Sequence, residues 1–378
     1  MLDKSKNKGE PRPYLRNLNV RWFEFALNDV LEMRFLPEEE ARYTAVNGDV
    51  LICEGGYPGR AAIWTDDEPI YFQKALHRVR FHEPERNKWF VYYLHFRDLE
   101  GTLSKHFNGA GIQHFTGEAL AKFELPVPPL PEQQRIVGIL DEAFEGIATA
   151  KANAEKNLQN ARTLFESHLD SVFNQPAKGW LVTTIIDATG GVFTGPFGSL
   201  LHKRDYVENG IPLVNPAHIT ETGIEPDLRK TVSNESIVRL SAYVMREGDI
   251  VIGRRGEMGR CALVTSVEDG WLCGTGSFFI KPSAVCDTRY LVRFLRSQGC
   301  RESLEKLAGG AVMPNLSNSA LGNLKFYLPP IEAQMGILRA IDELHEETQR
   351  LETLYHQKLT ALDALKKSLL HQAFSGAL

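Results

Sequence analysis

The stretch GRRGEMGR at residues 253–260 carries three arginines, Arg254, Arg255 and Arg260, separated by glycines. Glycine tolerates the backbone angles of a tight turn, so the pattern predicts a hairpin tip from which the arginines project. A guanidinium group can donate two parallel hydrogen bonds to the edge of a guanine, and it can also clamp a phosphate. We therefore take the three arginines as candidate contacts to DNA, with a solvated turn as the alternative for each.

Neighbouring loops of the same region supply further polar side chains. TGPFGSLLHKRDY at 194–206 sets a basic cluster beside a Gly-Pro-Phe-Gly turn, where contact with phosphate is favoured over base reading. NPAHI and MPNL add asparagines, which can pair bidentately with adenine but can also hold a turn. The candidates from these loops are His202, Lys203, Arg204, Asn215, His218 and Asn315.

The arginine stretch has a relative near the start of the chain. GDVLICEGGYPGRAAIW at 48–64 aligns with GDIVIGRRGEMGRCALV at 248–264, with Arg60 retained and Glu54 and Gly55 in place of two arginines. Two hairpins with such different tips should prefer different bases, and Glu54 could accept from a cytosine amino group. The candidates for DNA contact in this half are Arg16, Asn17, Asn19, Tyr57, Arg60, Lys74, Lys105, Gln113 and His114.

Two more pairs of segments repeat in the same order. VPPLPEQQRIVGILD at 127–141 returns as LPPIEAQMGILRAID at 328–342, and GAGIQHFTGEAL at 109–120 returns as GAVMPNLSNSAL at 310–321. Three matches at a nearly constant offset indicate that the chain is two copies of one module. Within each copy, short β-branched and aromatic runs broken by Gly, Pro and Asn predict a strand-rich globular part.

After each proline-rich phrase the apolar period becomes helical. The paired prolines Pro128-Pro129 and Pro329-Pro330 forbid helix and are expected to end the last strand of each globular part. An acidic residue in the first turn that follows, Glu132 or Glu332, favours the helix dipole. A long helix with one apolar stripe needs a partner, and we expect the two helices to pair antiparallel with each other. The stripe residues expected at this pairing are Phe144, Ile147, Leu158, Phe165, Leu344, Leu351, Tyr355, Leu362 and Leu369.

Composition and motif content exclude several classes of protein. The 378 residues carry a formal charge of −5, which alone does not suggest a DNA-binding protein. Neither a membrane-length apolar run nor the apolar core of a secretion signal is present, so we expect a cytoplasmic protein. The five cysteines and 11 histidines show no metal-ligand spacing. The GxxxxGK[ST] motif and a methyltransferase Asn/Asp-Pro-Pro-aromatic motif are also absent, which predicts no catalysis and no bound cofactor or metal.

The order of these elements resembles the specificity subunit of type I restriction-modification systems. The likeness covers nearly the whole chain and rests on PPLPEQQRIVGILDEAF, on GDIVIGRRGEMGR, on TGPFGSLLHKRDY and on the terminal AFSGAL. Each motif is weak alone, but their combination in this order is specific. The resemblance implies a non-catalytic chain in which each of two target-recognition domains reads one half of a split site in double-stranded DNA.

The resemblance also implies partners and a fold. Methyltransferase and restriction/translocase subunits would assemble on the helices and bind S-adenosylmethionine, ATP and Mg. The expected fold class is α+β, with two strand-rich target-recognition domains separated by two long antiparallel coiled-coil helices and an internal pseudo-two-fold repeat. The expected domains are 1–130 and 178–330 for recognition, with the long helices at 131–177 and 331–378.

One departure complicates this picture, because residues 179–210 have no counterpart in the first copy. The first recognition domain is therefore expected to be N-terminally shortened. It could read DNA poorly, self-associate to borrow the missing element from another chain, or mark a degenerate or orphan subunit with one active domain. A coiled-coil scaffold for protein interactions is a further alternative, and it predicts no affinity for DNA.

Overall fold

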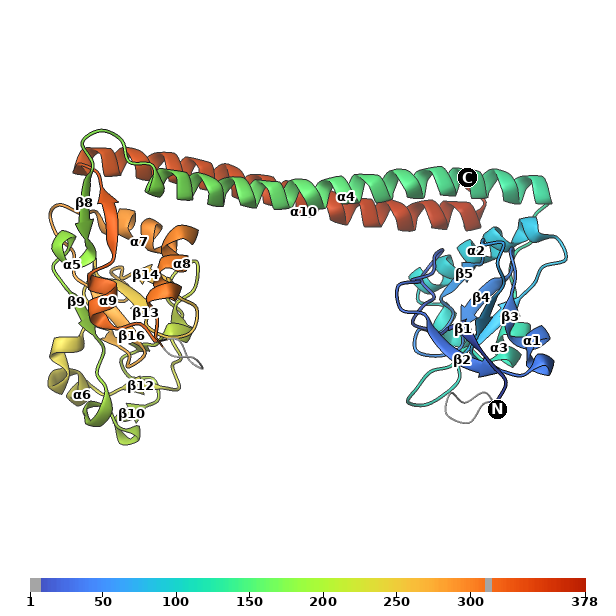
Figure 1. The fold of residues 1–378 in the computed structure, drawn as a ribbon, viewed down its shortest axis with the longest axis horizontal. Helices are drawn as coiled ribbons and strands as arrows, with labels where there is room; N and C mark the ends of the chain where they lie inside the picture. Colours follow the sequence, from blue (N-terminus) through green and yellow to red (C-terminus); the bar gives the residue numbers. More distant parts are fainter. Residues whose placement is uncertain (1–7, 310–314) are drawn as a thin grey trace. The chain divides into compact units, whose positions relative to one another are not determined.

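The computed structural model describes residues 8–309 and 315–378, apart from the side chain of Lys203. The chain forms two compact units. Unit 1 contains the chain up to Glu155 and again from His356, and unit 2 is Lys156–Tyr355. Two 45-residue helices, α4 (Leu130–Asn174) and α10 (Ile331–Ser375), contribute to both units (Figure 1).

Unit 1 is built on two small sheets. The first is antiparallel with the strand order β5-β4-β7, and the second has the order β2-β1-β6-β3. The four residues of β4 are buried, as its apolar sequence VLIC requires. The strands are β1 (Glu10–Leu15), β2 (Leu31–Phe35), β3 (Thr44–Ala45), β4 (Val50–Cys53), β5 (Ala61–Ile63), β6 (Ile70–Phe72) and β7 (Leu76–Val79), and the helices are α1 (Pro37–Tyr43), η1 (Pro84–Arg86), α2 (Asn87–Leu99), η2 (Leu103–His106) and α3 (Gly117–Ala121).

Unit 2 has a central sheet of order β14-β13-β16-β9 and three two-stranded pairs, β8 with β17, β10 with β12, and β11 with β15. Its strands are β8 (Leu181–Thr184), β9 (Val192–Thr194), β10 (Tyr206–Val207), β11 (Leu213–Val214), β12 (Thr231–Val232), β13 (Ile250–Gly253), β14 (Cys261–Leu263), β15 (Leu272–Cys273), β16 (Ser277–Ile280) and β17 (Lys325–Leu328). Its helices are α5 (Ile185–Ala188), η3 (Gly198–Leu200), η4 (Lys203–Asp205), η5 (Pro216–His218), α6 (Asn234–Arg239), η6 (Ser241–Tyr243), α7 (Thr288–Arg296), α8 (Gln298–Leu307) and α9 (Asn318–Gly322).

The internal repeat extends to strand register. Leu51 of β4 pairs with Ala62 of β5, and Val251 of β13 pairs with Ala262 of β14, each 200 residues later. Both copies also contain one parallel pair, β1 with β6 and β11 with β15. The expected α+β class, with two strand-rich domains, two long helices and an internal repeat, is confirmed.

The two long helices pack against each other antiparallel within each unit. In unit 1, Ile136 near the start of α4 shares a buried cluster with Leu370 near the end of α10. In unit 2 the order reverses, because Phe173 near the end of α4 shares a cluster with Leu338 near the start of α10. Of the part of the chain that is described, no helix is both long and apolar enough to cross a membrane.

The residues expected on the pairing stripe differ in their burial. Ile147 is buried, and Leu351 is 40% exposed. Thr348 occupies the buried place instead, at 8% exposure, with its hydroxyl donating to the carbonyl of Leu344 at 2.8 Å. A satisfied threonine can lie in the seam, whereas an apolar stripe read from the sequence favours leucine. The remaining stripe residues are half-buried: Phe144, Leu158, Phe165, Leu344, Tyr355, Leu362 and Leu369.

Candidate nucleic-acid interface

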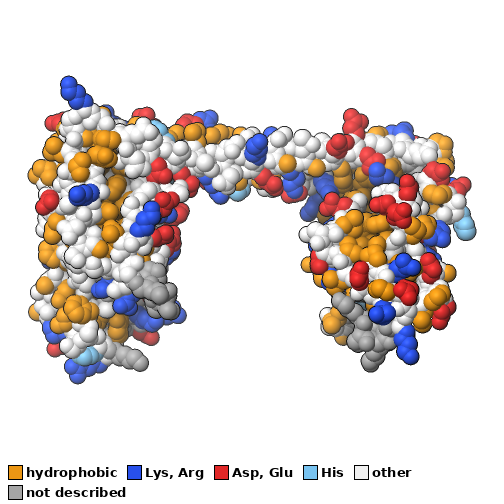
Figure 2. Space-filling model, in the orientation of Figure 1, with side chains coloured by type: hydrophobic (Ala, Val, Ile, Leu, Met, Phe, Trp, Pro, Cys, Tyr) orange, Lys and Arg blue, Asp and Glu red, His pale blue; other side chains and the backbone are white. Residues whose placement is uncertain are grey.

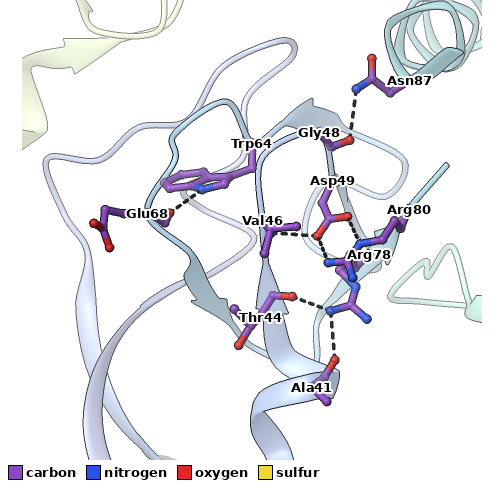
Figure 3. Close-up of polar contacts among 10 residues, drawn as sticks. All are labelled: Ala41, Thr44, Val46, Gly48, Asp49, Trp64, Glu68, Arg78, Arg80 and Asn87. Atoms are coloured by element: carbon purple, nitrogen blue, oxygen red, sulfur yellow. Dashed lines mark hydrogen bonds and ion pairs between the residues drawn. The ribbon is translucent and has the colours of Figure 1, made fainter. Parts of the chain in front are cut away.

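The hairpin of unit 1 is anchored at its base by Asp49, which is 1% exposed. Its carboxylate accepts from the backbone N–H of Val46 at 2.9 Å and from Nε and a terminal nitrogen of Arg80 at 2.6 Å each (Figure 3). Arg78 of β7 lies beside it and donates to the carbonyls of Ala41 in α1 and Thr44 in β3, which ties these two elements to β7. The buried charge is therefore fully compensated, which makes the hairpin a rigid base for its tip.

The hairpin of unit 2 repeats this anchor, with a lysine in place of Arg80. Asp249 is 1% exposed, accepts from the N–H of Arg246 at 2.8 Å, and pairs with Lys281 Nζ at 2.6 Å. The fixed residues of the two hairpins thus belong to the fold rather than to recognition. Differences at their tips can alter binding without altering this base.

The tip in unit 2 brings three predicted residues together. Gly256 and Gly259 have positive φ, which allows the expected turn. Nε of Arg254 donates to Asn315 Oδ1 at 3.1 Å, and Nε of Arg255 donates to the same oxygen at 3.3 Å. Asn315 is 60 residues further along the chain, so the loop before α9 completes the hairpin surface.

The two guanidinium groups differ in their surroundings. Arg255 is exposed, while Arg254 is half-buried and lies over the ring of Phe278 at 5.3 Å. Burial lowers the pKa of Arg254, and the neighbouring charge of Arg255 lowers it further. Phe278 was not among the expected site residues, because it lies in the apolar run SFFI, which predicts a buried strand and gives no sign of a site. Two like charges held together by one amide oxygen form a local surface suited to an anion or to hydrogen-bond acceptors.

Arg260 is less available than its neighbours. Its guanidinium pairs with Glu257 on the same hairpin, and the other oxygen of Glu257 lies 3.8 Å from Arg301. An exposed acidic partner competes with any anionic ligand for this arginine.

The tip in unit 1 gathers a different set. Nδ2 of Asn17 donates to the carbonyl of Gly55 at 3.0 Å, and a Cβ added to Gly55 would lie 3.0 Å from His114 Nδ1. Arg60 stacks on Tyr57 at 3.9 Å from the ring centroid, and Tyr57 is 55% exposed. Four predicted residues thus surround this tip, with an exposed aromatic ring in place of paired arginines.

The same loop meets the hairpin in both copies. The residue after His114 donates its N–H to the carbonyl of Glu54 at 2.7 Å, and the residue after Asn315 donates to the carbonyl of Arg254 at 2.9 Å. His114 and Asn315 are therefore equivalent positions, as are Glu54 and Arg254. The backbone frame is shared and the side chains on it differ.

Some predicted residues hold loops instead of projecting from them. Asn19 is 2% exposed, accepts from the N–H of Arg16 at 2.9 Å, and donates to the carbonyls of Ala26 and Asp29. Arg16 pairs with Asp29 at 2.6 Å. Because the amide of Asn19 is consumed by these bonds, its burial argues against the direct DNA contact expected from the sequence.

The equivalent loop of unit 2 is held in the same way. His218 Nδ1 lies 2.9 Å from the carbonyl of Leu213 and 3.4 Å from the N–H of Asn215. Asn215 Oδ1 closely approaches the backbone at Gly274, where an added Cβ would lie 2.3 Å from it. PYLRNLNV at 13–20 aligns with PLVNPAHI at 212–219, which places Asn19 opposite His218, and the two residues have matching roles.

The other predicted residues lie outside the two tip clusters. Asp205 accepts from the N–H of His202 at 2.6 Å and pairs with Arg239 at 2.9 Å, which orders the basic turn. The Lys203 side chain lies outside the described part. The other predicted residues outside the tip clusters have exposed side chains: His202, Arg204, Lys74, Lys105 and Gln113.

Figure 2 shows Lys and Arg side chains gathered toward the lower end of the left-hand domain, which is unit 2.

In the ranges that the structure describes, no group of three or more His, Cys, Asp or Glu side chains is arranged to hold a metal. The five cysteines are buried and unpaired.

Comparisons with known proteins agree with this architecture. The family model for the type I restriction modification DNA specificity domain matches residues 19–159 and 190–361. The EcoBI specificity subunit of Escherichia coli is 21% identical over 346 residues, which cover 84% of this chain and 71% of that protein.

Two solved structures share the fold. A chain from a study of complex assembly and conformational transition of the type I R-M system has a TM-score of 0.77 at 19% identity, covering 100% of this chain and 94% of that one. The HsdS subunit from Thermoanaerobacter tengcongensis has a TM-score of 0.65 at 19% identity, covering 100% and 93%.

Proposed function

The chain belongs to the family of type I restriction modification DNA specificity domains, and we propose that it is the sequence-specific DNA-recognition subunit of a type I restriction-modification complex. It reads a target of two parts in double-stranded DNA, one part with each copy of the module. It is a non-catalytic subunit, so the chain itself needs no cofactor.

One observation carries this proposal. Both copies place a hairpin tip against the same following loop, and the equivalent positions hold Arg254 with Asn315 in one copy and Glu54 with His114 in the other. Arginine and asparagine donate to purine edges, whereas a glutamate accepts from a cytosine amino group. A shared frame with unlike polar tips suits two dissimilar base sequences.

The partners belong to the same proposal. Methyltransferase and restriction/translocase subunits assemble with this chain, and they bind S-adenosylmethionine, ATP and Mg and carry out methylation and cleavage. The complex acts in the cytoplasm. These assignments follow from the family to which the chain belongs.

The test replaces Arg254 and Arg255 together with alanine. Loss of one good bidentate contact costs about 1–3 kcal/mol of discrimination, so preference at one part of the target should relax by about 5- to 150-fold. Binding is measured by selection from randomised duplexes followed by titration, at one salt concentration because phosphate contacts depend on salt.

The matched control is Arg289→Ala, which removes an exposed arginine of the same unit that pairs with Asp287 at 2.9 Å. It should leave the base preference unchanged. Unaltered preference in the double variant would contradict the assignment of the hairpin tip. A wild-type chain without affinity for DNA would instead favour the protein scaffold.

A further inference from the structure

In unit 2, one continuous segment, residues 181–194, folds as strand, short helix and strand on the outside of the domain. Its β9 covers the outer edge of β16, where the N–H of Gly195 donates to Ser277 O and the N–H of Lys281 donates to Gly191 O, each at 3.0 Å. Its β8 pairs with β17, and the N–H of Ile185 extends this ladder to Leu324 O at 3.1 Å.

The surfaces that receive this segment recur in unit 1. β7 pairs with β4 as β16 pairs with β13, because Val50 pairs with Val79 and Ile250 pairs with Ile280. Trp89 Nε1 donates to Pro126 O at 2.8 Å, and Tyr290 Oη donates to Tyr327 O at 3.0 Å from the equivalent helix. The chain at 124–127 therefore lies where β17 lies in the second copy.

Among the described residues, nothing pairs with these surfaces in unit 1. In residues 8–309 and 315–378 the sheet ends at β7, and Leu76 O and the backbone N–H and C=O of Arg80 have no hydrogen-bond partner. Their counterparts Ser277 and Lys281 bond to residues 190–195. Val127 is 62% exposed, whereas its counterpart Leu328 is 8% exposed. An open strand edge beside uncovered apolar side chains is a template for strand addition.

The sequence of the uncovered strand position is compatible with a new neighbour. Because Ile185 bonds to Leu324, residues 324, 326 and 328 face β8 and residue 327 faces away. Pro126 takes the place of residue 327, so its missing N–H falls on the side away from an incoming strand.

One side-chain hydrogen bond that holds the segment in the second copy cannot form in the first. Asn318 Nδ2 donates to Val192 O at 2.9 Å, and Gly117 stands at the equivalent position. Binding in unit 1 would therefore depend on the backbone ladder and on apolar contacts.

We propose that the outer edge of β7 together with α3 and residues 124–127 is a docking surface for a strand–helix–strand segment of another polypeptide, with the apolar and Thr-rich chemistry of residues 181–194. The segment adds by β-augmentation, in which main-chain bonds supply affinity and alternate side chains supply fit. The chain's own copy is committed elsewhere, since Ile185 is 0% and Ala188 1% exposed in unit 2. A second copy of this chain could donate it only by opening its own domain.

The test adds a fluorescein-labelled peptide with the sequence of residues 179–196 to the full chain. We expect saturable one-to-one binding by fluorescence anisotropy, together with slower amide hydrogen exchange at residues 76–80 and 124–127. Absence of saturable binding would overturn the proposal, and so would protection confined to unit 2.

Two peptide variants provide the matched control. Residues 191, 193 and 195 face β16, so Phe193→Pro removes a ladder donor, whereas Thr194→Pro changes a position that faces away. Phe193→Pro should weaken binding by about tenfold or more, and Thr194→Pro should weaken it much less. Equal affinities would contradict strand addition. A dimer of the chain that the peptide dissociates would identify the second copy as the occupant and refute the proposed source.

Discussion

At the scale of single residues, some polar side chains form the surface of a hairpin tip and others hold a loop in place. The sequence alone does not distinguish these two roles. Arg254, Arg255 and Asn315 meet in the structure, a contact that the sequence did not predict because about 60 residues of chain separate Asn315 from the arginines. Asn19 aligned with His218 and was expected to reach DNA, yet each side chain fastens its own loop. A polar residue type in a loop does not reveal whether its side chain points outward or back to the main chain.

A buried histidine provides a prediction on pH. His95 is 5% exposed, its ring lies 4.6 Å from that of Trp22, and neither ring nitrogen has a hydrogen-bond partner among the described residues. Burial lowers the pKa of His95 to about 3, with the nearby charge of Lys366 contributing. The folded chain therefore excludes a proton that the unfolded chain binds below about pH 6.5.

Because this pKa is depressed on folding, the stability supported by neutral His95 is lost as the pH falls from about 6.5 toward 3. Linkage gives a loss of about 2 kcal/mol by pH 5. In urea unfolding at pH 7.5 and pH 5, the variant His95→Phe should lose that much less stability than the wild type. An identical pH dependence in both proteins would show that folding does not lower the pKa of His95.

At the scale of elements, the proline-rich phrase fixes where each long helix begins. Pro329 follows the end of β17, as predicted, whereas the residues immediately before Pro128 form no strand. A buried glutamine reinforces each turn: Gln133 Nε2 donates to Pro128 O at 2.7 Å, and Gln334 Nε2 donates to Pro329 O at 2.8 Å. The repeated glutamine was visible in the sequence. Its partner was not, because a bond to a preceding carbonyl leaves no trace in residue type.

The helix seam provides a second prediction. Leu370 is fully buried between α4 and α10 in unit 1, whereas Leu351 is 40% exposed on α10. Leu370→Ala should lower the unfolding free energy by about 2–5 kcal/mol because it leaves a cavity. Leu351→Ala should change it by about 0.5 kcal/mol or less. Urea unfolding of both variants measures the difference, and comparable losses would show that the seam is misplaced.

At the scale of the whole molecule, duplication is the feature that the sequence predicted best. Three aligned phrases indicated two modules, and the strands pair in the same register in both. The absence of a counterpart to residues 179–210 was also visible. In the described part of the chain, the β7 edge has no neighbouring strand and Val127 beside it is exposed, and this arrangement of main-chain groups required coordinates. The expected domain boundaries remain a prediction.

The proposed function requires that the two copies read two different parts of one DNA target. Methylome sequencing of cells that express this chain with its cognate methyltransferase subunit tests it most directly, with the Arg254→Ala/Arg255→Ala variant in parallel. We expect modified adenines in a motif of two specified parts separated by unspecified bases, and we expect the variant to change only one part. A single contiguous motif, or a variant that alters both parts equally, would contradict the account.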